Sequence, residues 1–172
     1  MPNPSSPRFP ADSWAEVRSH DRVTRYRRSG SGPAVLLLQS GDAAGALWPE
    51  LLHELEDHHR VVVPEAPPAE GDVAHWIADF LEGLGLASVA VLAAGEFCIP
   101  VLELALLGTD GVTSVVLVPD GDAAETGLEG TLATTIRHEA VALLVVRRGL
   151  RASEAVPLVR RFFSAAEVLP PG

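Results

Sequence analysis

Short apolar runs alternate along most of the chain with segments in which apolar residues recur at helical spacing. Runs this short and this rich in Val and Leu are typical of strands that are buried on both faces of a parallel sheet. The alternation of the two patterns predicts an α/β fold with a mostly parallel, doubly wound sheet. The predicted buried strands are residues 35–38, 61–63, 89–92, 115–118 and 142–146, and the predicted helices are residues 47–55, 73–84, 99–107 and 154–163.

The outer parts of this pattern set the domain boundaries. Residues 1–12 are rich in Pro and Ser and are expected to form a flexible tail. Residues 13–172 are expected to form one domain, because 172 residues with 47% hydrophobic content suffice for one sizeable core. Residues 22–28 alternate in the way an edge strand does. Residues 121–138 carry a weaker helical pattern and are expected to form a small cap over a site.

Composition lowers the expectation for several kinds of partner. The formal charge is −10, with 13 basic residues, all arginine, against 23 acidic ones. Such a chain repels phosphate backbones and anionic lipids, so neither nucleic acid nor a membrane is an expected partner. A single cysteine, Cys98, allows no internal disulfide. No signal-peptide or phosphate-loop pattern is present, so we expect a cytoplasmic protein without a cofactor.

Several local strings resemble the α/β-hydrolase superfamily. Residues 26–38 read YRRSGSGPAVLLL, which is similar to the second strand, the turn and the third strand of that family. Residues 47–55, the string VVVPEAP at 61–67 and the string VLELAL at 101–106 continue the resemblance. The resemblance implies an atypical, shortened α/β-hydrolase-like fold with a reduced cap.

The chain departs from this family at the positions that carry its chemistry. The family places a nucleophile on a sharp turn between strand and helix, and the matching residue here is Gly95. The position of the acid matches Ala152, and the histidine would lie beyond residue 172. The oxyanion segment reads QSGD at 39–42, where a carboxylate at Asp42 opposes developing negative charge. The resemblance therefore implies a protein without the catalytic triad, which is not a working serine hydrolase.

Ligands of such sheets bind at the carboxyl ends of the strands, so the candidate site residues lie in the loops that follow them. A carboxylate beside apolar walls can act as an acid or a base, although solvated loop acids are the simpler interpretation. The candidate catalytic residues are Asp42, Glu96 and Asp120, and the candidate substrate-binding residues are Gln39, Ser40, Trp48, Gly95, Phe97 and Cys98.

Cysteine and histidine add little to this site. Cys98 lies at a predicted helix start, where the helix dipole can lower a thiol pKa, but a buried, inert thiol fits the helical pattern better. His58 and His59 have no third ligand at a recognisable spacing and are expected to form a solvated turn. We therefore expect no metal site.

Two functions from different classes fit these features. In the first, the protein binds a small apolar substrate and promotes its cyclisation, dehydration or epimerisation by orienting it, as a cyclase or isomerase of natural-product biosynthesis. In the second, it is an inactive pseudo-hydrolase that binds a ligand or a protein partner.

A homodimer is expected because the last predicted helix carries more apolar side chains than one buried face needs. An isologous contact is the commonest way to cover such a surface. The apolar residues concerned are Val156, Leu158, Val159, Phe162 and Phe163.

Overall fold

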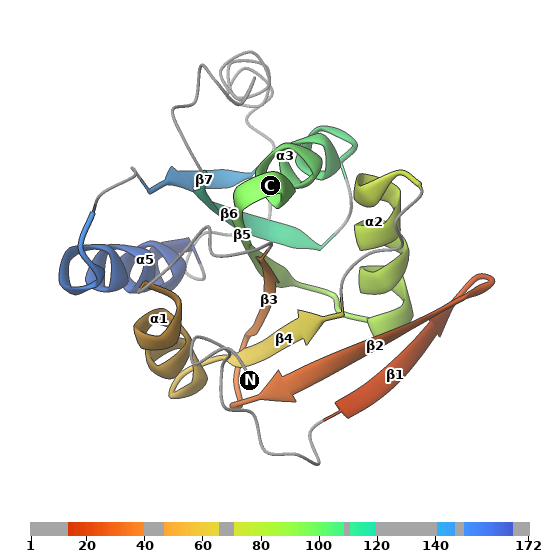
Figure 1. Ribbon diagram of the computed structural model, residues 1–172, viewed down its shortest axis with the longest axis horizontal. Helices are drawn as coiled ribbons and strands as arrows, with labels where there is room; N and C mark the ends of the chain where they lie inside the picture. Colours follow the sequence, from red (N-terminus) through yellow and green to blue (C-terminus); the bar gives the residue numbers. More distant parts are fainter. Residues whose placement is uncertain are drawn as a thin grey trace, which may run out of the picture.

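A computed structural model describes residues 14–39, 47–65, 71–108, 111–119, 141–146 and 150–166. Over these residues the chain forms one seven-stranded sheet in the order β1-β2-β4-β3-β5-β6-β7, flanked by helices (Figure 1). The strands are β1 (Trp14–Ser19), β2 (Arg22–Ser29), β3 (Ala34–Gln39), β4 (Arg60–Pro64), β5 (Val89–Ala94), β6 (Val112–Val118) and β7 (Ala142–Val145).

Strands β4, β3, β5, β6 and β7 run parallel, whereas β1 and β2 are antiparallel to their neighbours. In the parallel part, Gln39 lies opposite Ala94, and Ala94 lies opposite Val118. The last residues of three adjacent strands therefore end together at the carboxyl edge of the sheet. The predicted mostly parallel α/β fold is confirmed.

Helices cover both faces of the sheet (Figure 1). α1 (Leu47–Glu56) and α5 (Ala152–Ala166) lie side by side on one face, and α2 (Val73–Leu84) and α3 (Cys98–Leu106) lie on the other. Successive strand side chains enter different cores, so that Val91 packs beneath α2 and α3 while Leu92 packs with α1 and α5. Among the described residues, no helix is long and apolar enough to cross a membrane.

The bounds of α2 are those that the sequence predicts, and both ends have a physical cause. The Asp72 carboxylate accepts a hydrogen bond from the backbone N–H of His75 at 3.1 Å, which caps the first turn. Hydrogen bonds from His75 also hold the pKa of Asp72 below its ordinary value. Gly85 ends the helix in the left-handed conformation at φ 62°.

The edge of the sheet differs from the prediction. β2 pairs with β4 on one side and with β1 on the other, so β1 is the edge strand. The sequence did not predict β1 because its inward side chains, Ala15, Val17 and Ser19, are small or polar and give almost no apolar alternation. The predicted tail at 1–12 and the predicted cap at 121–138 lie outside the described residues.

His59 was expected in a solvated turn, and that expectation is wrong. Its side chain is only 4% exposed, and its ring lies 5.9 Å from the ring of Phe163 on α5. The backbone N–H of His59 donates to the carbonyl of Leu55 at 2.7 Å. This bond closes α1 and turns the chain into β4, which directs the His59 ring beneath α5, while His58 stays exposed.

The expected surplus of apolar surface on α5 is also not found. Val156, Val159 and Phe163 are buried within the chain, because α5 packs against both α1 and the sheet. Phe162 packs partly against the same core, and only Leu158 is clearly exposed, at 42%. The homodimer remains a prediction, without support from this helix face.

A glycine substitution tests the packing between the end of β2 and the end of α1. Gly30 adopts φ 69°, and a Cβ there would overlap the carbonyl oxygen of His59 and lie 2.6 Å from that of Glu56. We expect Gly30→Ala to lower the free energy of unfolding by at least about 3 kcal/mol. The alanine would be held at a strained positive φ, and the backbone around Glu56 and His59 would also have to move. Urea denaturation monitored by circular dichroism measures this loss.

Gly85→Ala is the matched control for that prediction. Gly85 has a similar φ of 62°, but a Cβ there meets nothing within 4 Å. It should therefore cost only the left-handed strain of about 1–2 kcal/mol. If both variants lost the same free energy of unfolding, the close approach of Gly30 to the Glu56 and His59 carbonyls would not contribute to the loss.

Candidate functional site

The turn after β5 connects the centre of the sheet to α3. The chain passes from Ala94 into a short 3-10 helix, η1 (Gly95–Phe97), and then directly into α3. Gly95 adopts φ 65°, in the left-handed region. In α/β-hydrolases, the sharp strand-to-helix turn at this place carries the nucleophile. Here the residue at the turn is a glycine, which accepts the conformation without a Cβ penalty and has no hydroxyl or thiol.

Two other predicted site residues lie at the same edge of the sheet. Gln39 is the last residue of β3 and lies opposite Ala94, the residue before the turn. Gln39 is therefore beside the turn. Glu96 is within the turn itself and is exposed. The structure thus brings Gln39, Gly95 and Glu96 together, whereas Ser40, Asp42 and Asp120 lie outside the described residues.

The predicted aromatic walls do not share one surface. Trp48 is 2% exposed and belongs to the core beneath α1 and α5. Phe97 is 5% exposed and belongs to the core on the opposite face, beneath α2 and α3. The sheet separates them because η1 and α1 cover different faces. Both side chains therefore contribute to packing, and neither is positioned to line a cavity with the other.

Burial governs the chemistry of Cys98. The residue is 3% exposed, and its thiol donates to the carbonyl of Ala93 at 3.5 Å. Loss of solvation raises the thiol pKa to about 11, and a backbone hydrogen bond from Val118 lowers it only in part. The start of α3 favours a thiolate by its dipole, but this effect is smaller than desolvation. The burial of Cys98 that the helical pattern favoured is confirmed, and its lack of reactivity remains a prediction.

The region matched to the family's acid lies at the start of α5. Ala152 is the first residue of that helix and has no carboxylate. Glu154 is close by, but its carboxylate is bound by Arg151, with Nε and Oε2 3.3 Å apart. These hydrogen bonds hold the pKa of Glu154 below its ordinary value. Glu154 is therefore an exposed, ionised partner of Arg151 rather than a proton donor.

A separate group of polar side chains was not recognised from the sequence. His20, in the turn between β1 and β2, lies next to Asp79 and Glu82 of α2. The only local signal was the spacing of Asp79 and Glu82, which places both on one face of a helix. The contribution of His20 depends on a contact between segments far apart in the chain.

Comparison with solved structures identifies the fold. A carboxylesterase from Bacillus subtilis is 19% identical over 62% of this chain and 43% of its own, with a TM-score of 0.53. Naproxen esterase from Bacillus subtilis is 15% identical over 62% and 43%, with a TM-score of 0.52. A bromoperoxidase from Bacillus anthracis is 22% identical over 61% and 44%, with a TM-score of 0.50.

These likenesses assign the α/β-hydrolase fold to the chain, as the resemblance of its strings implied. The matched part spans less than half the length of each of the three neighbours. At such low identity the likeness establishes the fold and not the chemistry. No protein-family model matches the sequence, and no curated protein matches it.

The state of Cys98 can be tested by its reactivity. With a pKa of about 11, only about one thiol in a thousand is ionised at about pH 8. We expect the native protein to react with iodoacetamide at least about 100-fold more slowly than the urea-unfolded chain. Mass spectrometry of timed samples gives both rates, and a native rate equal to the unfolded rate would contradict the burial of this thiol.

The same pKa predicts how stability changes in alkali. The folded pKa is higher than the ordinary thiol value of 9.0, so the folded state holds the proton more tightly than the unfolded state. This contribution to stability is complete below about pH 9 and is lost as the pH rises towards 11. Cys98→Ala should flatten the fall in urea midpoint over this interval, and an unchanged slope would argue against the assignment.

Proposed function

We propose that this protein is a non-hydrolytic α/β-hydrolase-fold protein, a pseudo-hydrolase that binds a small molecule at the carboxyl edge of its sheet. The observation that carries the proposal is Gly95 at the turn after β5. Covalent ester hydrolysis begins with attack by a side-chain nucleophile that is activated by a base. Gly95 offers no atom for that attack.

Among the described residues near this turn, Cys98 does not replace the missing nucleophile. Cys98 is the nearest thiol in sequence to the turn, and burial keeps it protonated and turned towards the Ala93 carbonyl. A thiol attacks as the thiolate, so a pKa of about 11 removes this route near neutral pH.

Binding is favoured over chemistry by the way the aromatic side chains are used. An enzyme that orients an apolar substrate needs apolar walls that converge on one cavity. Trp48 and Phe97 instead fill the two cores on opposite faces of the sheet. Among the described residues at the edge, the Gln39 amide and the Glu96 carboxylate are of the chemical types that form hydrogen bonds with a ligand.

One observation favours the enzymatic alternative. Glu96 is exposed within the turn where this fold carries out its chemistry, so its carboxylate can accept or donate a proton on a bound substrate. Cyclisation, dehydration and epimerisation each need no more than orientation and one such group. The biosynthetic setting, the cytoplasmic location and the homodimer remain predictions from the sequence.

The proposal predicts that the protein does not hydrolyse activated esters. We expect the folded protein to hydrolyse p-nitrophenyl acetate no faster than the same concentration of unfolded chain does in the same buffer, and without an initial burst. We also expect no adduct with a fluorophosphonate, measured by intact mass. A stoichiometric burst together with a phosphonate adduct would overturn the proposal.

Two variants separate the remaining possibilities. Cys98→Ala tests whether any residual turnover comes from the thiol, and it should change nothing. Glu96→Gln keeps the shape of the side chain and removes its charge. If a substrate is found whose conversion falls at least about 100-fold in Glu96→Gln while its binding is kept, the enzymatic alternative replaces the binding module.

A further inference from the structure

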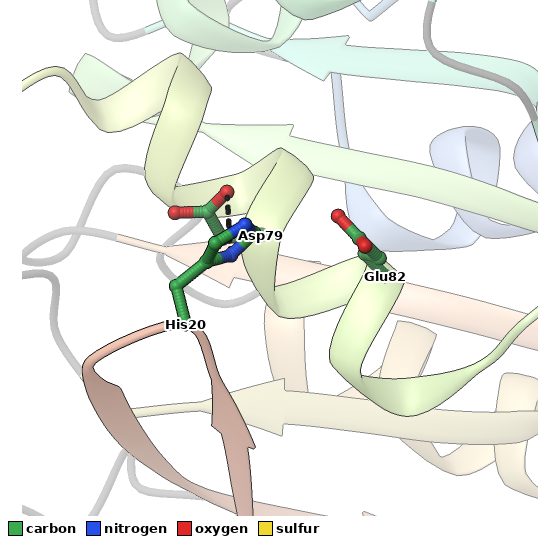
Figure 2. A group of neighbouring side chains, drawn as sticks. All are labelled: His20, Asp79 and Glu82. Atoms are coloured by element: carbon green, nitrogen blue, oxygen red, sulfur yellow. Dashed lines mark ion pairs between the residues drawn. The ribbon is translucent and has the colours of Figure 1, made fainter.

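Three ligating side chains meet at the β1 end of the sheet, apart from the turn at Gly95. One ligand atom each from His20, Asp79 and Glu82 lies within 4.8 Å of the others. Figure 2 shows the His20 ring facing the Asp79 carboxylate, with Glu82 further along α2. His20 Nδ1 and Asp79 Oδ1 are 3.7 Å apart. Asp79 is half-buried, while His20 and Glu82 are exposed.

The sequence of α2 allows the β1–β2 hairpin to pack close to these side chains. Asp79, Glu82 and Gly83 share one face of α2, because positions three and four apart are neighbours on a helix. A Cβ on Gly83 would lie only 2.9 Å from Val17 Cγ2 and 3.1 Å from Ser19 Cβ. Glycine therefore allows β1 to pack directly on the helix, which brings the following residue, His20, to the two carboxylates.

The hairpin is also held against α2 by its second strand. The ring of Tyr26 on β2 meets the ring of Phe80 edge-on, with centroids 5.7 Å apart. His20 itself adopts a left-handed φ of 52° in the tight turn. The backbone that carries the imidazole is thus fixed by packing on both strands, so forming a complex there requires little further ordering.

We propose that His20, Asp79 and Glu82 bind a divalent transition-metal ion of the zinc class. One imidazole nitrogen and two carboxylate oxygens form a mixed ligand set that zinc accepts. In a tetrahedral zinc complex with bonds of about 2.1 Å, ligand atoms lie about 3.4 Å apart. The His20–Asp79 separation of 3.7 Å is close to this value. The Glu82 carboxylate lies within 4.8 Å of both, on an exposed side chain that can move towards an ion.

The bound ion clamps the β1–β2 hairpin to α2. The His20–Asp79 contact is between partly exposed groups and is weak in water. The ion replaces it with coordinate bonds to the imidazole of the hairpin and to the carboxylates of α2. The acidic chain, with a formal charge of −10, favours cation binding in general. Three protein ligands leave a further position open to water or to an added ligand.

Calorimetric titration of the tag-free, chelator-treated protein with zinc chloride tests the site. We expect saturable binding of one ion per chain, with much weaker binding of magnesium and calcium, which prefer all-oxygen sites. Zinc should also slow amide hydrogen exchange in the hairpin, residues 14–29. No saturable zinc binding, or tighter binding of magnesium or calcium, overturns the proposal.

Single variants identify the ligands. His20→Asn keeps a residue that tolerates left-handed φ, and Asp79→Asn and Glu82→Gln keep side-chain shape. We expect each to weaken zinc binding at least about tenfold while circular dichroism stays unchanged.

His75→Gln is the matched control. His75 lies on the same helix and, among the described residues, pairs with the carboxylate of Asp72, with Nδ1 2.8 Å from Oδ2. It should bind zinc as the parent does. Unchanged binding in His20→Asn, or a loss in His75→Gln equal to that in His20→Asn, overturns the assignment.

Discussion

Strand β5 is buried on both of its faces, and this burial determines where a ligand can reach the centre of the sheet. Val91 and Leu92 follow one another and enter different cores, each completely removed from solvent. Each such side chain contributes about 1.5–3 kcal/mol by burial. The buried side chains within the strand therefore cannot reach a ligand. Among the described residues in the middle of the sheet, a ligand can therefore reach the end of β5 and the turn that follows it, beside the ends of β3 and β6.

The burial that stabilises the two cores also lowers the reactivity of the residues nearest this turn. Cys98 begins α3, where a helix dipole contributes typically 0.3–1 kcal/mol in favour of an anion. Burial opposes it by more than that, since the thiol pKa rises from 9.0 to about 11 and each unit corresponds to about 1.4 kcal/mol. Phe97 is drawn into the same core. Among the described residues at this edge, Gln39 and Glu96 are polar and lie outside the two cores.

Features encoded by local pattern could be predicted from the sequence, and features that depend on distant contacts could not. The buried strands correspond to short runs of Val and Leu. The ends of α2 correspond to Asp72 and Gly85, which lie next to the helix in the sequence. β1 was missed because it is polar and pairs only through β2. His59 was misplaced because its burial depends on Phe163 of α5. The position of His20 beside α2 likewise depends on Gly83, whose role is visible only once β1 is packed against it.

The glycine at the turn after β5 has a consequence for stability as well as for chemistry. A residue with a side chain held at a positive φ costs about 1–3 kcal/mol, which hydrolases of this fold accept in order to expose a nucleophile. At φ 65°, Gly95 adopts the conformation without that cost. The two cores and the sheet order do not depend on a hydroxyl at this position. The turn at Gly95 therefore forms without the strain that a residue with a side chain would carry at this φ.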